Sequence, residues 1–168
     1  MLVTAVAFSD FILAVHILGV VIGFGVVFTF PLVLGRAAKT DPALIPWLLR
    51  IRQVLGRYLV NPGLLVVVVA GFGLASDEHR WGSFFVGWGI LAALVIGAVE
   101  GAIVIPRSGR LAEIAERDLA ATAVPGGGQR TSAAWSDDYQ ATAGLLSRAT
   151  LLTQVLVVVT VFLMALHA

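Results

Sequence analysis

The chain contains no cysteine, and only 12% of its 168 residues are charged at neutral pH. The absence of cysteine excludes disulfide scaffolds, thiol catalysis, iron–sulfur clusters and covalently attached c-type haem. Soluble domains usually carry about 25% charged residues, so the shortage of charge argues against a water-soluble domain. The formal net charge is +1, and no basic stripe is interleaved with aromatic residues, which argues against nucleic acid as a partner.

Short motifs of several enzyme classes are also missing. The sequence has no P-loop motif and no nucleophile-elbow motif, and no two carboxylates lie together within an apolar run. The polar connections between the apolar runs are short and leave little room for a soluble active site. These absences favour a binding or accessory protein over an enzyme.

Hydrophobic residues make up 59% of the chain and gather in four long runs. A helix of about 20 apolar residues crosses roughly 30 Å of hydrocarbon. The runs are Phe11–Gly35, Tyr58–Ala75, Ser83–Pro106 and Ala149–Ala168. Glu100 is the only Asp, Glu, Lys or Arg within them. We predict an all-α, single-domain integral membrane protein that forms a four-helix bundle in the lipid bilayer.

The distribution of Lys and Arg predicts the orientation, because positive residues are retained on the cytoplasmic side. Five lie in the first connection: Arg36, Lys39, Arg50, Arg52 and Arg57. Five lie in the third connection: Arg107, Arg110, Arg117, Arg130 and Arg148. The second connection has only Arg80. We therefore expect an N-out/C-out topology in a bacterial cytoplasmic membrane, with the first run retained rather than cleaved as a signal.

The two basic connections are expected to form cytoplasmic helical extensions of the spans. Asp41-Pro42 is typical of a helix start, and this helix would enter the second run with a kink near Asn61-Pro62-Gly63. Residues 107–123 have helical composition, whereas residues 125–129 (Pro-Gly-Gly-Gly-Gln) predict a flexible break. Asp137 with Gln140 resembles a capping box that starts a helix leading into the last run.

Small residues indicate where the helices pack, because close approach drives association in lipid. Two GxxxG pairs occur, Gly19 with Gly23 in the first run and Gly97 with Gly101 in the third. His16 shares the glycine face of the first helix, and Glu100 lies on that of the third. Both polar residues are therefore expected to point into the bundle. The same glycine faces are candidates for contacts in a homo-oligomer or a larger membrane complex.

A layer of polar residues is predicted at a similar depth from the cytoplasmic ends. It contains Thr29, Asn61, Glu100 and Gln154. An ionisable group within a membrane is by default a functional hypothesis, and Glu100 is a candidate proton carrier. The alternative is that Glu100 is neutral, or pairs with Arg57 or Arg107, and only joins helices by hydrogen bonds. Asn61 is expected to satisfy backbone groups that Pro62 frees.

Three histidines are candidate ligands for a metal or haem on the outer side: His16, His79 and His167. No His-x-x-x-His or Glu-x-x-His pair supports this chemistry, and a chance cluster at the surface explains His79 and His167. His16, about two turns into the membrane, is the better candidate. Its alternative role is a single hydrogen bond to a neighbouring helix.

The run from His16 to Pro31, together with Asn61-Pro62-Gly63 and Gly71-Phe-Gly73, resembles an uncharacterised family of four-helix bacterial membrane proteins. Similar first helices that begin with a histidine occur in the copper-resistance D type of membrane protein and in the J-type membrane protoporphyrinogen oxidase. In the oxidase type, this histidine is implicated in haem binding. The resemblance implies a ligand role for His16, with haem b or a copper or zinc ion as the cofactor. Leu32 replaces an arginine of the oxidase type, and no run holds a lysine, so the oxidase activity is not implied.

Three functions remain open on these residues. The first is a binding or accessory protein with its site at His16. The second is a small proton-coupled transporter that uses Glu100, and the third is a structural subunit of a membrane complex.

Overall fold

The computed structural model describes residues 8–77, 79, 81–121 and 135–167, with the side chain of residue 167 outside the description. All regular elements in this part of the chain are helical, and none of its residues forms a strand. Four helices are long and apolar enough to cross a membrane, as the four apolar runs predict.

Two of these four helices are continuous and two are composite. The continuous ones are α1 (Phe8–Thr40) and α6 (Asp137–His167). The second helix joins η1 (Pro42–Leu44), α2 (Ile45–Leu55), η2 (Gly56–Val60) and α3 (Asn61–Asp77). The third joins α4 (Phe84–Val99), η3 (Glu100–Val104) and α5 (Ile105–Ala121). Each helix therefore extends past the predicted span at the basic connections.

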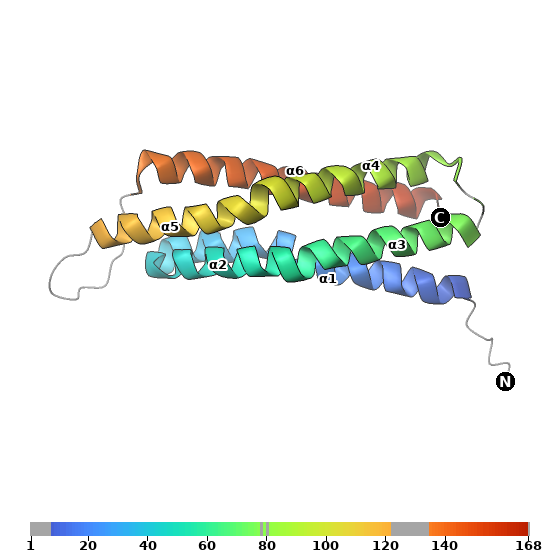
Figure 1. Ribbon diagram of the computed structural model, residues 1–168, viewed down its shortest axis with the longest axis horizontal. Helices are drawn as coiled ribbons and strands as arrows, with labels where there is room; N and C mark the ends of the chain where they lie inside the picture. The colour runs from blue at the N-terminus through green and yellow to red at the C-terminus, as the bar shows by residue number, and fades with distance from the viewer. Residues whose placement is uncertain (1–7, 78, 80, 122–134, 168) are drawn as a thin grey trace, which may run out of the picture.

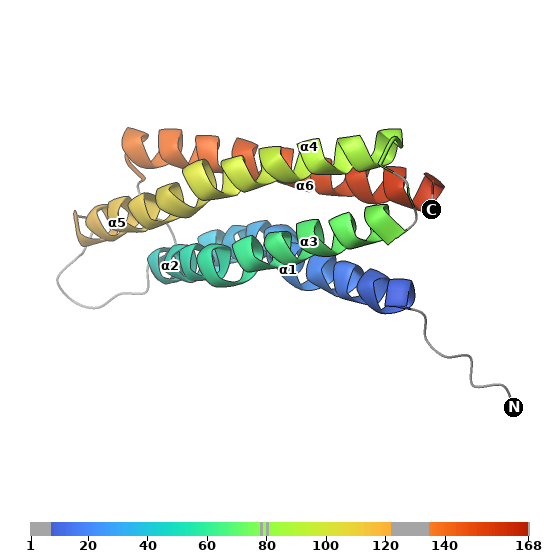
Figure 2. The same ribbon diagram turned by 45° about the vertical axis from the view of Figure 1, so that its right-hand side comes forward.

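The four helices lie side by side along one long axis (Figures 1 and 2). α1 packs on α3, α2 on α5, and α4 on α6. We call the end where α1 begins and α6 ends the terminal end, and the opposite end, where α1 ends and α6 begins, the basic end. A buried apolar layer, made of Phe24, Val27, Val60, Ile96 and Val157, lies between the helices. A second core, nearer the basic end, includes Leu49, Leu111 and Leu146.

Two prolines explain why the composite helices contain π-helical turns. Pro62 and Pro106 lack an amide hydrogen, and their rings crowd the carbonyl four residues earlier, which lies within η2 or η3. Each π turn ends two residues before its proline, and the following amides, of Asn61 and Ile105, bond to the carbonyls five residues back. The expected kink at Asn61-Pro62-Gly63 is therefore taken up by a wider turn just before it.

The two helix starts predicted in the basic connections are present, but one is capped by another residue. Asp41 Oδ1 accepts a hydrogen bond from the Ala43 amide at 3.1 Å, with Pro42 following, as predicted. For α6, the cap is Ser136 rather than Asp137: Ser136 Oγ accepts from the Tyr139 amide at 3.2 Å. The break expected at residues 125–129 lies outside the described residues.

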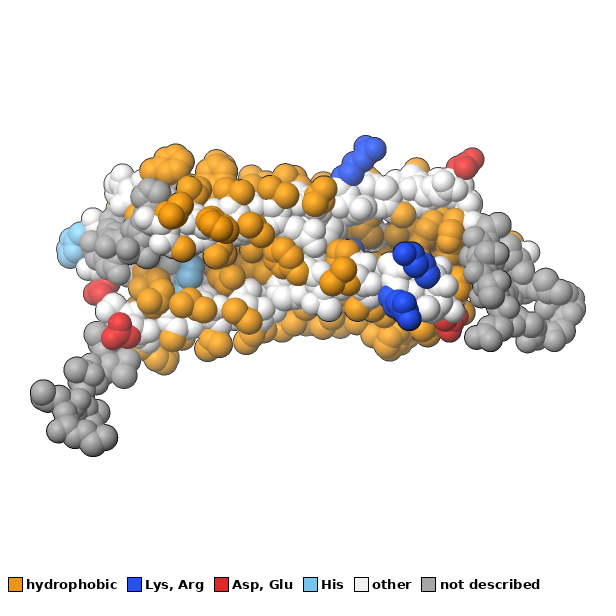
Figure 3. Space-filling view, turned by 180° about the vertical axis from the view of Figure 1, so that it is seen from behind, with side chains coloured by type: hydrophobic (Ala, Val, Ile, Leu, Met, Phe, Trp, Pro, Cys, Tyr) orange, Lys and Arg blue, Asp and Glu red, His pale blue; other side chains and the backbone are white. Residues whose placement is uncertain are grey.

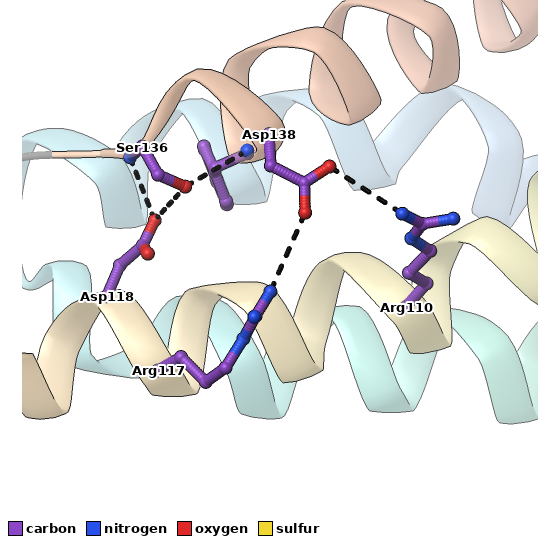
Figure 4. A network of polar contacts seen from close by, with 6 residues as sticks. Arg110, Arg117, Asp118, Ser136 and Asp138 are labelled. Carbon is purple, nitrogen blue, oxygen red and sulfur yellow. Dashed lines mark hydrogen bonds and ion pairs between the residues drawn. The ribbon is translucent and has the colours of Figure 1, made fainter.

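Ser136 takes the capping role because α5 holds it in place (Figure 4). Its amide and its hydroxyl both donate to Asp118 Oδ2, at 2.9 and 2.8 Å. The next turn adds ion pairs from Arg110 and Arg117 of α5 to Asp138, at 3.7 and 3.6 Å. The start of α6 is thus anchored by a contact between helices that a local capping pattern does not include.

Glycines set the closest helix crossing, which joins α1 to α3. A Cβ atom on Gly63 would lie 2.7 Å from Gly23 Cα, and one on Gly19 would lie 3.0 Å from a Val67 methyl group. Gly97 faces Leu64, whose Cδ2 would be 3.2 Å from an added Cβ. Gly101 is exposed and has open space around it. The first GxxxG pair therefore packs against α3, in the second of the four long helices.

The outer surface is largely apolar, as the space-filling view of one face shows (Figure 3). Large hydrophobic side chains are exposed on all four helices, for example Leu32 at 75% and Leu94 at 68%. On this face the Lys and Arg side chains lie in the half nearer the basic end. Such a surface suits contact with lipid tails over much of the length of the helices.

Candidate functional site

Glu100 is the most deeply buried acidic side chain among the described residues. It begins η3 and is 2% exposed. The Thr153 hydroxyl of α6, also fully buried, lies next to its carboxyl. Glu100 Oε1 and Thr153 Oγ1 make no hydrogen bond of ordinary geometry with the described residues. A buried acceptor without a partner is costly, so this carboxyl is a candidate for binding a proton or a ligand.

Arg52 is the cation that acts on Glu100. Its side chain is 7% exposed, and Nη2 donates a hydrogen bond to Thr150 Oγ1 of α6. The guanidinium carbon also lies 5.9 Å from the centre of the Phe30 ring, which adds a cation–π contact. Three helices therefore hold one guanidinium near the buried carboxyl. Arg57 and Arg107, the partners suggested by the sequence, do not have this role.

The structure does not bring all four residues of the predicted polar layer together. Gln154 Nε2 donates to Val27 O at 3.0 Å and so joins α6 to α1. Thr29 is exposed and donates to Gly25 O of its own helix at 2.8 Å. Asn61 is half-buried at the start of α3. We call the group that does surround Glu100 the glutamate cluster, which consists of Glu100, Arg52, Thr150 and Thr153.

Sequence reasoning missed Arg52, Thr150 and Thr153. A signal for Arg52 was present: Ile45, Leu48 and Leu49 are buried, and Arg52 continues their helical face. An arginine on the apolar face of a helix needs a buried partner. The positive-inside pattern accounts for Arg52 only as a charge in a basic connection and does not indicate that it needs a buried partner.

His16 lies nearer the terminal end and bonds to a neighbouring helix. Its Nδ1 is 2.8 Å from Val67 O of α3. Because a carbonyl oxygen only accepts, Nδ1 carries the hydrogen and Nε2 is the nitrogen that is free to bind a proton or a metal in the neutral ring. Gly71 makes room for the imidazole, since a Cβ there would lie 3.3 Å from His16 Cε1.

The His16 ring borders a small cavity between the four helices. The cavity has a volume of about 60 Å³ and is lined mainly by apolar side chains of α1, α3, α4 and α6. Its polar lining side chains are His16 and Thr160, and Thr160 accepts a hydrogen bond from Trp88 Nε1 at 3.0 Å. We call this space the histidine cavity.

These dimensions do not fit a haem. Pockets for ligands of drug size typically measure about 300–1,000 Å³, several times the histidine cavity. A copper or zinc ion would find one imidazole there, and the described residues contain no group of three or more His, Cys, Asp or Glu side chains suited to a metal. His79 lies on an exposed turn with φ of 53°, and the His167 side chain lies outside the description.

No family model, curated protein or solved structure matches the chain. The likeness of the His16–Pro31 run to four-helix bacterial membrane proteins therefore stays a prediction. The case for function rests on the glutamate cluster and the histidine cavity.

Proposed function

We propose that the protein is a small proton-coupled transporter of the bacterial cytoplasmic membrane, in which Glu100 is the proton carrier. It works as a four-helix bundle with both termini outside. Because four helices enclose little volume, we expect it to act as a homo-oligomer or within a larger membrane complex. The observation that carries the proposal is a 2%-exposed carboxyl, one oxygen of which makes no hydrogen bond of ordinary geometry within the described residues, in the field of a buried guanidinium.

The charge distribution supports this orientation. An even number of spanning helices brings both termini to one side of a membrane, and α1 begins at the same end at which α6 ends. The basic connections belong at the opposite end, where positive residues are retained in the cytoplasm. Glu100 then faces the interior in the cytoplasmic half of the bundle.

Proton exchange at Glu100 depends on Arg52 as a positioning residue. Burial in apolar surroundings and a nearby guanidinium act in opposite directions on the proton affinity of a carboxyl. When the guanidinium stays near Glu100, the carboxylate is stabilised. When it moves away from Glu100, the carboxyl takes up a proton. The π turns η2 and η3, which contact one another, supply a place where the helices can adjust.

A structural role for the same residues is the main alternative. Polar groups between membrane helices often serve only to join them, and a buried ion pair is weak support for either stability or function. The two roles differ in one respect that can be measured. A transporter needs the titratable carboxyl, whereas a structural contact is largely preserved by its uncharged isostere glutamine.

The test uses purified protein in liposomes that contain a pH-sensitive dye. A potassium diffusion potential, negative inside, drives protons inward through the wild type. We expect Glu100→Gln to reduce the rate to that of empty liposomes. Thr29→Val, which alters an exposed hydroxyl bonded to its own helix, serves as the control and keeps the wild-type rate.

Two further measurements make the result decisive. Size-exclusion chromatography and circular dichroism establish that Glu100→Gln remains folded. Infrared difference spectra between two pH values should show a protonated carboxyl band that is absent in the variant. A folded Glu100→Gln protein that carries protons as fast as the wild type would overturn the proposal.

Ligand binding at His16 is the second candidate function. The Val67 hydrogen bond leaves Nε2 as the ring acceptor, beside a cavity lined by all four helices. The cavity volume limits this ligand to a few atoms, well short of a haem. Its test is the elemental analysis described in the Discussion, in which stoichiometric copper or zinc that is lost in His16→Ala would support this function.

A further inference from the structure

The histidine cavity and the glutamate cluster lie along the same interior faces. On α4, the cavity is lined by Gly89, Ala93 and Ile96, and Glu100 follows Ile96 by one helical turn. A turn of four residues rises about 6 Å. On α6, Thr153 of the glutamate cluster comes four residues before the lining residue Val157 and so lies nearer the basic end by the same interval.

The apolar layer separates the two polar sites. Phe24, Ile96 and Val157 belong both to this layer and to the cavity lining. The cavity therefore ends on the layer, and Glu100 with Thr153 lies one turn beyond it. Proceeding from the terminal end, the interior holds an imidazole, a small cavity, one apolar layer and a buried carboxyl.

We propose that His16 is the proton-exchange group between the terminal-end solution and Glu100. This inference rests on the proposed function. It gives His16 a role in addition to the binding of the proton by Glu100. The route runs through the histidine cavity and across the apolar layer.

The proton can be followed through each step. Water at the terminal end gives a proton to His16 Nε2, which makes the ring an imidazolium. The Nδ1–H bond to Val67 O is present before and after this step, so the ring keeps its place. The imidazolium then releases the Nε2 proton to water in the cavity, and a transient water chain across the apolar layer delivers it to the Glu100 carboxylate. His16 returns to the neutral form, and outward movement reverses these steps.

The charged surroundings of His16 are simple. No other titratable side chain lines the cavity from α1, α3, α4 or α6 within the described residues. Among the described residues, the carboxylates of α1 and α3 toward the terminal end are Asp10 and Asp77. Asp10 precedes His16 by six residues, and Asp77 follows Gly71 by six, which is about 9 Å along a helix in each case.

A purely structural hydrogen bond would not require this side chain. A glutamine amide also donates to a carbonyl, but it does not take up a proton. The imidazole further needs Gly71 opposite it and borders a cavity that ends on the apolar layer. The bond, the glycine and the cavity together suit a ring that titrates.

The test compares proton flux in the liposome assay for His16→Gln, for His16→Ala and for the control Thr29→Val. His16→Gln should slow the flux about 100-fold, as for loss of a positioned proton-transfer group. Added imidazole should restore much of the rate to His16→Ala, because the missing ring leaves space beside the cavity. Thr29→Val, which changes an exposed hydroxyl bonded to its own helix, should keep the wild-type rate.

A second variant leaves both titratable groups in place. Val157→Phe fills the cavity at the apolar layer, and we expect it to slow the flux at least tenfold while the Glu100 infrared band persists. Wild-type flux in folded His16→Gln and Val157→Phe, with Glu100→Gln inactive, would overturn the His16 route and leave the proposed function standing. Wild-type flux in Glu100→Gln as well would overturn both.

Discussion

Arg52 and Thr150, 98 residues apart in the sequence, are joined by a hydrogen bond from the guanidinium to the threonine hydroxyl in the interior of the protein. The bond links α2 to α6, and Thr150 in turn donates to Leu146 O at 2.8 Å. The bond fixes the position of the guanidinium that acts on Glu100, although Arg52 lies in one of the two basic connections of the sequence.

This relationship predicts energetic coupling between Arg52 and Glu100. Arg52→Met should lower the free energy of unfolding by about 1–3 kcal/mol, because it removes the buried donor to Thr150 and the guanidinium that acts on Glu100. Adding Glu100→Gln should recover part of this loss, with a coupling energy of about 0.5–3 kcal/mol. Denaturant titration of the four proteins in detergent micelles measures the cycle. Strictly additive losses would show that the two side chains do not act together.

The crossing of α1 and α3 predicts that Gly63 tolerates no side chain. In Gly63→Ala, the new Cβ would lie 2.7 Å from Gly23 Cα, so the two backbones must move apart. We expect a loss of about 1–3 kcal/mol in the free energy of unfolding. Gly25→Ala is the matched control, since nothing lies within 4 Å of its added Cβ. Equal stability of the two variants would contradict the crossing.

The start of α6 predicts different effects for two adjacent residues. Ser136→Ala removes the cap and the hydroxyl contact with Asp118, and should cost about 1 kcal/mol or more. Asp137→Ala changes an exposed first-turn residue, and the loss of its favourable dipole interaction should cost only about 0.3–1 kcal/mol. Thermal unfolding in micelles compares them. A larger effect of Asp137→Ala would contradict this and support Asp137 as the cap, as its spacing to Gln140 predicts.

The proposed topology predicts the labelling of introduced thiols. The chain has no cysteine, so Gly82→Cys and Thr40→Cys each provide a single reactive site. Both positions are exposed, at opposite ends of the helices. In cells whose outer membrane has been made permeable, an impermeant maleimide should label Gly82→Cys at once and Thr40→Cys only after the cytoplasmic membrane is opened. The reverse pattern would invert the topology.

The size of the histidine cavity predicts a colourless protein. Purified from haem-replete cells, it should show no Soret band in oxidised or reduced spectra, and elemental analysis should find no stoichiometric copper or zinc. This follows from a cavity of about 60 Å³ with one imidazole. A Soret band that disappears in His16→Ala would instead support the haem role implied by the family resemblance.

Particular residues show how far sequence patterns reach. The apolar runs predict four helices of membrane-spanning length, and Asp41-Pro42 predicts a helix start; both are confirmed. The spacing of Asp137 and Gln140 predicts Asp137 as the cap of α6, but the structure has Ser136 in this role, because the partner that holds Ser136, Asp118, belongs to another helix. A sequence pattern within one segment predicts the structure correctly when the residues of that segment alone determine it.

By itself, the sequence determined the helical class, the four apolar segments and the concentration of Lys and Arg in two connections, since these depend on composition and local spacing. Only the tertiary structure decided which polar groups meet. Helix faces cannot be extrapolated through η2 and η3, because a π turn adds a residue and rotates the following face by about 100°. The long Arg52 side chain then reaches past its own turn to Thr150 and the vicinity of Glu100. That grouping depends on how four helices pack together, a property that no single segment encodes.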